Sequence, residues 1–218
     1  TDADIVCLQE VGEIVLNKIK NKREYRKALK SYPYIKSGSS EGLYSVICLS
    51  KYPFINSTRI KYESKSNSSF RYEVLVGDDT IRIVNNHLES NKLDPVEKKK
   101  YSTTLRNRES KNISELAKIL GNKVGSATSI RGHQALKVHE TISDSHYRTI
   151  VCGDFNDVPG SYTYRKIRNG LSDAWIEKGF GWGNTFHDNL FLFRIDYILH
   201  SKDMECVECR IDRVRYSD

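Results

Sequence analysis

Long apolar runs, proline and glycine-rich stretches are scarce in these 218 residues, and each scarcity excludes a class of protein. The longest apolar runs, such as Ile5 to Leu8, are far shorter than the roughly 20 residues that a membrane-spanning helix needs. With 4 prolines and 13 glycines, the chain has no composition typical of a long flexible linker. Its 38% of hydrophobic residues exclude a disordered or collagen-like chain. We expect one soluble folded domain, residues 1–218, without membrane contact.

Cysteine is present, but not in the pattern of a disulfide framework. The 5 cysteines are an odd number, and Cys7, Cys48 and Cys152 lie in apolar strand-like runs where cysteine acts as a small hydrophobe. Cys206 and Cys209 form one C-x-x-C pair without a second Cys/His pair, and in a strand their side chains would point to opposite faces. We expect a reducing compartment, the cytoplasm by default, and leave open an upstream signal or membrane anchor.

Positive charge is in excess. Lys and Arg number 35 against 28 Asp and Glu, which gives a net charge of +7 and a pI near 9.1. This balance favours an anionic partner such as nucleic acid, a phosphoester or a membrane surface. Two basic clusters, Lys18 to Lys30 and Lys98 to Lys111, are also typical of solvated helix faces, so charge alone does not choose the partner.

Strand-like and helix-like patterns alternate along the chain. A strand at 5–8 precedes helical spacing up to Tyr32, and helical spacing between residues 110 and 142 predicts two helices, one ending at Gly121 and one starting at Ser129. Further β-type runs cover residues 43–49, 54–62, 70–76, 80–87, 149–152, 194–200 and 205–216, with a helix at 161–168 and a Gly-rich aromatic loop at 179–186. The pattern predicts an α/β fold.

Polar residues with catalytic potential stand where several of these strands end. Each has a plain structural explanation when taken alone: Glu10 as a first-turn acid, His87 as a hydrogen-bonded strand-end histidine, Asp154 and Asn156 as Asx-turn residues, and Asp196 as the partner of a nearby arginine. Taken together they suit one task. Carboxylate oxygens bind Mg²⁺-like ions, and His and Asn bind phosphate, so the set indicates phosphoester hydrolysis.

These segments resemble the endonuclease/exonuclease/phosphatase superfamily, which includes pancreatic-type deoxyribonucleases, apurinic endonucleases, neutral sphingomyelinases and inositol phosphatases. The matching segments are Asp4 to Glu10, Asn86 to Leu88, Gly153 to Asn156, Arg194 to Leu199 and Ser217-Asp218. The resemblance implies a four-layer α/β sandwich, with two packed, mixed, mostly antiparallel sheets flanked by helices. It also implies a metal-dependent phosphodiesterase or phosphatase that uses Mg²⁺ or Mn²⁺.

The resemblance assigns a role to each matching residue. Glu10 and Asp218 would ligate the metal ion, and His87 would contact the scissile phosphate. Asp154 and Asn156 would orient the nucleophilic water and a phosphate oxygen.

Asp196 would orient the histidine of the family's closing S-D-H motif. Neither that histidine nor the family's first, Asn-bearing strand is present in these residues, so we expect the chain to be part of a longer enzyme.

Nucleic acid is the substrate class that the basic composition favours, with lipid or inositol phosphoesters and a non-catalytic binding module as alternatives. Arg165 and Arg168 follow the Gly153 to Asn156 turn, and we expect them to be the basic residues nearest the chemistry. Trp182 and Phe186 would stack on a base, line a lipid groove or form a local hydrophobic cluster. We expect a monomer.

Overall fold

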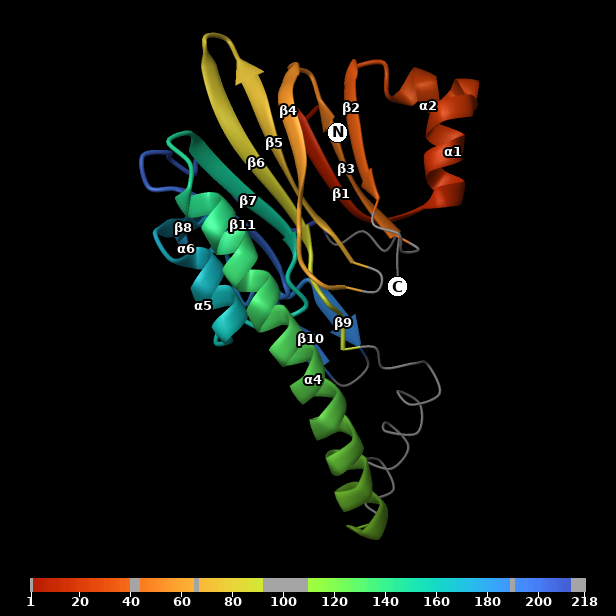
Figure 1. Cartoon of the computed structure of the whole chain (residues 1–218), viewed down its shortest axis with the longest axis vertical. Coiled ribbons are helices and arrows are strands. Elements are labelled where there is room, and N and C mark those ends of the chain that lie inside the picture. Colours follow the sequence, from red (N-terminus) through yellow and green to blue (C-terminus); the bar gives the residue numbers. More distant parts are fainter. Residues whose placement is uncertain (1, 40–43, 65–66, 92–109, 189–190, 213–218) are drawn as a thin grey trace.

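Two β-sheets packed face to face form the centre of the molecule, and helices lie outside both (Figure 1). This computed structural model describes residues 2–39, 44–64, 67–91, 110–188 and 191–212. The smaller sheet is antiparallel, with the strand order β1-β3-β2. Its strands are β1 (Ile5–Gly12), β2 (Tyr34–Ser39) and β3 (Tyr44–Ser50), and its helices are α1 (Glu13–Asn21) and α2 (Arg23–Ala28).

The larger sheet has six strands in the order β4-β5-β6-β7-β11-β8. Neighbouring strands are antiparallel except β6 and β7, which are parallel and joined by the long helix α4. The strands are β4 (Phe54–Ile60), β5 (Ser69–Val76), β6 (Asp79–His87), β7 (Arg148–Asp154), β8 (Leu171–Asp173) and β11 (Asp196–Ser201). The remaining elements are α4 (Ser110–Ser143), α5 (Tyr162–Arg168), α6 (Ala174–Lys178) and the hairpin β9 (Phe186–Asp188) and β10 (Phe191–Phe193). The predicted α/β sandwich is confirmed.

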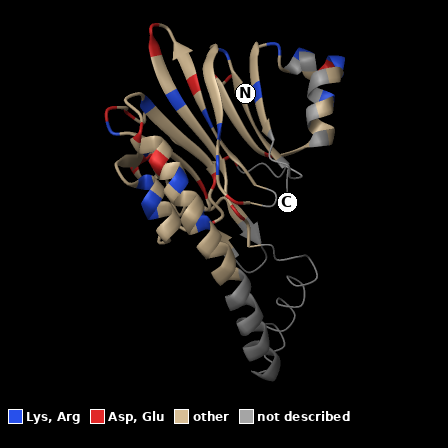
Figure 2. Ribbon diagram, in the orientation of Figure 1, with Lys and Arg blue, Asp and Glu red and all other residues tan. Residues whose placement is uncertain are grey.

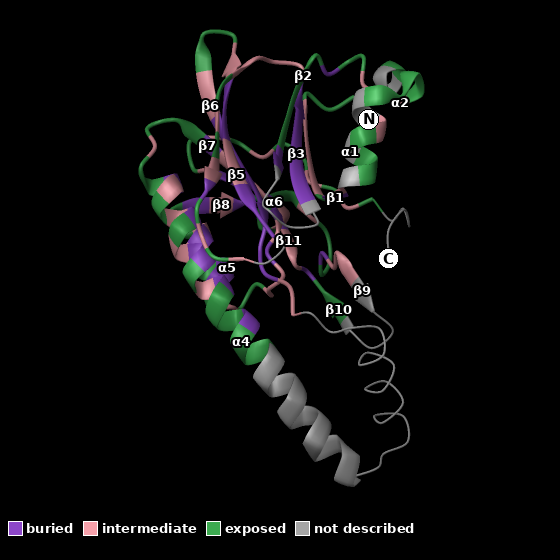
Figure 3. Ribbon diagram, turned by 45° about the vertical axis from the view of Figure 1, so that its right-hand side comes forward, coloured by how far each residue is buried: buried purple, intermediate pink, exposed green. Residues whose placement is uncertain are grey.

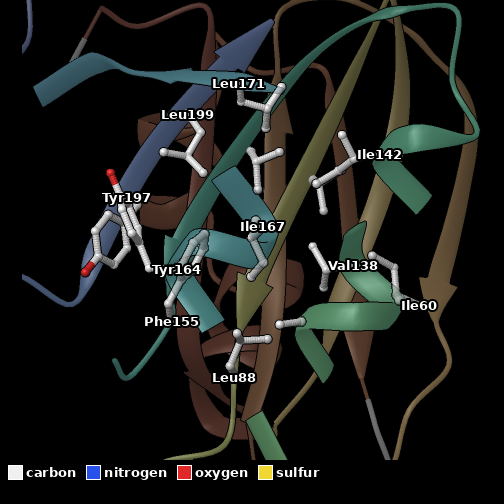
Figure 4. Close-up of a cluster of buried hydrophobic side chains, with 13 residues drawn as sticks. Ile60, Leu88, Val138, Ile142, Phe155, Tyr164, Ile167, Leu171, Tyr197 and Leu199 are labelled. Carbon is white, nitrogen blue, oxygen red and sulfur yellow. The ribbon is translucent and has the colours of Figure 1, made fainter. Parts of the chain in front are cut away.

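Successive side chains of the larger sheet point to opposite faces, and the buried ones form two cores, one on each face. Ile83 packs with Cys48 and Tyr72 between the sheets, whereas Val84 packs with Val138 of α4 on the helix side. Figure 3 shows the buried central strands, and Figure 4 shows the helix-side core. A shift of one residue in the pairing of a strand would turn each of its buried side chains to the opposite face of the sheet. The two cores therefore fix the register of β6, β7 and β11.

The structure corrects two expectations about regular elements. The helix α4 is continuous, where the pattern predicted a break between Gly121 and Ser129. A glycine inside a helix costs only about 1 kcal/mol, and the later turns are fastened to the sheet by Ala135 and Val138. The predicted strand at 205–216 is also wrong over its described part, because residues 205–212 form no strand. No helix among the described residues is long and apolar enough to cross a membrane.

Candidate active site

Three predicted site residues form one row across the larger sheet. His87 is the register partner of Asp154 on the neighbouring strand, and Asp154 is the register partner of Asp196 on the next. Register partners on adjacent strands project from the same face. That face is the one toward the smaller sheet. Ile150 and Cys152 lie four and two residues before Asp154 on β7, so their side chains point to the same face as Asp154, and both pack in the core between the sheets.

Glu10 reaches this row from the smaller sheet. The pairing of β1 with β3 shifts register between Leu8 and Val11, and Glu10 has a φ of +55° in this bulge. A bulge re-aims side chains, and here the Glu10 Oε1 lies 3.3 Å from the His87 Nε2. The histidine is buried, whereas 64% of the Glu10 side chain is exposed.

A pair of side-chain amides, the half-buried Gln9 and the buried Asn85, fixes the bulge against the larger sheet. Gln9 Nε2 donates to Asn85 Oδ1 over 2.6 Å, and Asn85 Nδ2 donates in turn to the carbonyl oxygens of Leu8 and Ile47. Since Asn85 stands two residues before His87 on β6, this contact sets how Glu10 meets the histidine. Gln9 belongs to the Asp4 to Glu10 segment, whereas no sequence pattern marked Asn85.

The turn after β7 holds both carboxylate oxygens of Asp154. Gly153 has a φ of +121°, and a Cβ there would lie 2.0 Å from the backbone oxygen of Asn86, so only glycine fits. The Asn156 backbone N–H donates to Asp154 Oδ1 over 2.6 Å, and its Nδ2 donates to Oδ2 over 3.1 Å and to the Leu88 carbonyl oxygen over 3.0 Å. The Asx-turn interpretation therefore describes the local structure, and it also orients the carboxylate.

The site carries an excess of negative charge. Burial, followed by the charge of Asp196, raises the pKa of Asp154 to about 7. Burial also raises the pKa of Asp196, although a hydrogen bond from Thr185 opposes this shift. The hydrogen bond from His87 lowers the pKa of Glu10. The charge of Glu10 also raises the pKa values of Asp154 and Asp196, and such mutual repulsion is typical of a site that binds a cation or transfers protons.

Asp196 is not neutralised by the arginine beside it in the sequence. Arg194 pairs with Asp173 through two contacts of 2.9 and 3.0 Å. The backbone N–H groups of Ile195 and Asp196 instead donate to the Thr185 hydroxyl oxygen over 3.2 and 3.1 Å. Thr185 is a site residue that the sequence analysis missed, and its one signal was its place in the aromatic loop.

Arg131 of α4 ties together the loops that follow β6 and β7. Its side chain is 2% exposed, and it donates to the Glu89 carbonyl oxygen over 2.9 Å, to Asn91 Oδ1 over 2.9 Å and to Asp157 Oδ2 over 3.2 Å. These loops begin directly after His87 and Asp154. With a further hydrogen bond to Thr128 Oγ1, this buried charge has four partners, and the helical pattern of the sequence did not reveal such a positioning residue.

The aromatic residues predicted to bind substrate lie on either side of Thr185. Trp182 is 91% exposed and so does not form the local hydrophobic cluster that was the alternative. Phe186 begins β9 and pairs with Phe193 of β10. The contacts of Thr185 with Asp196 bring this loop to the carboxylate row.

Arg165 and Arg168 lie elsewhere. They line a cavity of about 380 Å³ together with Leu171 and Lys202, and Leu171 pairs with Ser201 at the end of β11 away from Asp196. Figure 2 shows basic segments on α5 and the adjoining part of α4, and further ones on strands of both sheets and at α2. The expectation that these arginines are the basic residues nearest the chemistry is wrong, because α5 runs along the helix side of the sheet. Asp218 lies outside the described residues, as does most of the cluster from Lys98 to Lys111.

Comparison with known proteins identifies the family. The Endonuclease/Exonuclease/phosphatase family profile matches residues 1–218, so the chain belongs to this family of phosphoester hydrolases. No curated protein sequence gives a significant match.

Solved structures share the fold at low sequence identity. D. rerio TDP2, humanized by 14 mutations, is 18% identical over 93% of this chain and 72% of that chain, with a TM-score of 0.62. ANGEL2, described as a 2′,3′-cyclic phosphatase, is 16% identical over 93% and 70%, with a TM-score of 0.62. D. rerio TDP2 complexed with a single-strand DNA product is 18% identical over 93% and 73%, with a TM-score of 0.57.

Proposed function

We propose that the protein is a divalent-metal-dependent phosphodiesterase that hydrolyses nucleic acid. The observation that carries this proposal is the row of His87, Asp154 and Asp196, which Glu10 meets from the opposite sheet. Four groups from four strands converge although up to 186 positions separate them in the 218-residue sequence. Membership of a family of phosphoester hydrolases agrees with this chemistry.

The residues of the site suit a hard divalent cation. Glu10 offers an exposed carboxylate beside two acidic groups whose pKa values are raised, so a cation would relieve the repulsion among them. Mg²⁺ and Mn²⁺ prefer such oxygen ligands. Glu10 would hold the ion together with Asp218, which lies outside the described residues. When bound, the ion supplies positive charge to the phosphate and makes a bound water more acidic.

The protein side chains would perform the remaining steps. Asp154, oriented by Asn156, would position the attacking water in line with the phosphorus and take its proton. His87 would donate from Nε2 to a phosphate oxygen as its negative charge increases. Asp196 would position the family's closing histidine, and Asn156 would contact a second phosphate oxygen.

Nucleic acid is favoured over other phosphoesters by the net charge of +7 and by the exposed ring of Trp182, three residues before Thr185 in the same loop. D. rerio TDP2, which shares the fold, was crystallised with a single-strand DNA product, and this supports the same substrate class. In this proposal one base of the substrate stacks on Trp182, while its phosphate lies at the carboxylate row.

The test compares substrates and one aromatic residue. The full-length protein is assayed with Mg²⁺ or Mn²⁺ on a single-stranded oligonucleotide, on bis(p-nitrophenyl) phosphate, on sphingomyelin and on an inositol phosphate. We expect hydrolysis of the first two. Trp182→Ala should lower kcat/KM on the oligonucleotide by about 5- to 100-fold, the range of one lost stacking contact, and should spare the small diester.

Phe180→Ala is the matched control, because it removes a ring that is 95% exposed in the same loop but farther along the chain from Thr185. Equal losses in both variants would show that Trp182 does not bind a base. Activity on sphingomyelin or the inositol phosphate without activity on DNA would contradict nucleic acid as the substrate and favour the lipid or inositol phosphoesters. Failure on all four substrates would contradict the assignment as a phosphodiesterase.

A further inference from the structure

A second cluster of ligand-type side chains lies at the opposite end of β11 from Asp196. It consists of Glu177 of α6, His200 of β11 and Cys206, which follows β11. One carboxylate oxygen, one ring nitrogen and the thiol sulfur all lie within 4.8 Å of one another. In the described part of the chain, no other three His, Cys, Asp or Glu side chains converge in this way.

The hydrogen bonds of His200 leave one ring nitrogen free to act as a ligand. Its Nδ1 lies 3.0 Å from the Ser201 carbonyl oxygen, which can only accept, so Nδ1 carries a proton. The other ring nitrogen, Nε2, lies 3.2 Å from Glu177 Oε2 and so points toward the rest of the cluster. His200 is 6% exposed, and its buried Nε2 makes no hydrogen bond of good geometry.

This arrangement is the usual one for a metal-binding histidine. In metalloproteins the second ring nitrogen commonly donates to a backbone carbonyl, which fixes the tautomer and aims the first nitrogen at the ion. The Cys206 sulfur completes a set in which one nitrogen, one sulfur and one oxygen face a common point.

We propose that Glu177, His200 and Cys206 bind one Zn²⁺ ion, with water as the fourth ligand. Imidazole and thiolate ligands select zinc over magnesium, and tetrahedral zinc with bonds of about 2.0–2.3 Å requires only a small contraction of this cluster. On binding, the Cys206 thiol loses its proton to solvent and its sulfur forms the bond to zinc, so the reaction releases one proton and involves no oxidation.

The zinc ion would have a structural role. Residues 205–212 have no regular secondary structure, and the ion would fasten this segment to β11 and α6 through Cys206. His200 is four residues from Asp196 along β11, or about 13 Å at about 3.3 Å per residue. The site is therefore distinct from the carboxylate row, and the inference does not rest on the proposed function.

The Cys206 and Cys209 pair did not indicate a metal site by its spacing alone, because two of the proposed ligands come from remote positions in the sequence. The inference assigns the ion to Cys206 with Glu177 and His200, and not to the two cysteines together. Replacing each cysteine separately distinguishes these arrangements.

Cobalt absorbance tests the site directly, because a thiolate bound to Co²⁺ gives an intense near-ultraviolet band that oxygen ligands do not give. The full-length protein is kept reduced, stripped with a chelator and titrated with Co²⁺. We expect a band that saturates at one equivalent and that Zn²⁺, but not Mg²⁺, removes. Cys206→Ser and His200→Asn should abolish the band, Glu177→Gln should weaken Co²⁺ binding at least about 10-fold, and Cys209→Ser should keep the band.

Circular dichroism verifies folding, and if His200→Asn does not fold, the variants at Glu177 and Cys206 carry the test because these side chains are less buried. The proposal is overturned if one equivalent of Co²⁺ gives no band, if the band persists in Cys206→Ser, or if Cys209→Ser removes it. Cys206→Ser should retain the Mg²⁺-dependent hydrolysis, so failure of the zinc site and failure of the proposed activity are distinguishable.

Discussion

Replacing Asp154 by asparagine should stabilise the metal-free protein while removing its activity. The pKa of this carboxyl rises from 3.8 to about 7 because the group is buried and faces the charge of Asp196. Below pH 4 the group is protonated in both the folded and the unfolded chain. As the pH rises from 4 to 7 the unfolded chain releases its proton first, so the folded state loses stability over this range and carries the full penalty above pH 7.

The magnitude follows from that interval. At about 1.4 kcal/mol for each pH unit, the penalty reaches about 4 kcal/mol above pH 7. Asparagine cannot ionise, so it removes this penalty. Its NH₂ group, however, would replace Oδ2, which accepts from Asn156 Nδ2 over 3.1 Å, and the loss of that hydrogen bond costs about 1–2 kcal/mol. Asp154→Asn should therefore raise the free energy of unfolding by about 2–3 kcal/mol near pH 8 and lower it by about 1–2 kcal/mol near pH 4.

Urea unfolding in the presence of EDTA measures this difference. Wild type and Asp154→Asn are compared at about pH 4.5 and about pH 8, with Asp203→Asn, which makes the same substitution at an exposed position, as the matched control. A difference between Asp154→Asn and wild type that is the same at both pH values would refute the electrostatic argument. So would a variant less stable than wild type at the higher pH.

Other substitutions test separate parts of the account. His87→Ala should lower turnover of a phosphodiester by about 100-fold or more without unfolding the protein, measured by initial rates beside circular dichroism. Gly153→Ala should destabilise the fold by at least about 2 kcal/mol in urea, since its Cβ would meet the Asn86 oxygen at 2.0 Å. Neutralising Arg165 and Arg168 together should weaken binding of long DNA at low salt and flatten its salt dependence while sparing a small diester; flat salt curves for wild type as well would argue against a polyanionic substrate.

Local patterns predicted much of the fold and the strand-end positions of several candidate site residues. Strand alternation located β3 to β7 to within a few residues, and the strand-end positions of His87 and Asp154 placed them correctly before any geometry was known. Asn156 and Gly153 were recognisable because a short Gly-Asp-x-Asn segment imposes its own turn. In each case a few consecutive residues determine the local conformation.

The remainder depended on contacts between distant segments. Nothing near Arg131 in the sequence shows that it will bind the Glu89 carbonyl oxygen and Asp157, because its partners lie 42 and 26 positions away. Arg165 was predicted to lie near the site because it follows the Gly153 turn in the sequence. The seven-residue helix α5 instead carries Arg165 away from the strand end. The zinc ligands Glu177 and His200 meet only because α6 folds beside β11.

The dependence of phosphodiester hydrolysis on Mn²⁺ tests the central claim most directly. Turnover of bis(p-nitrophenyl) phosphate by the full-length protein is measured against Mn²⁺ concentration for wild type and Glu10→Gln. The account predicts saturable activation of wild type, complete loss of activity in EDTA, and at least about a 10-fold higher Mn²⁺ requirement for the variant, because Glu10 supplies a charged ligand oxygen. Hydrolysis that persists in EDTA, or a variant with the Mn²⁺ dependence of wild type, would contradict it.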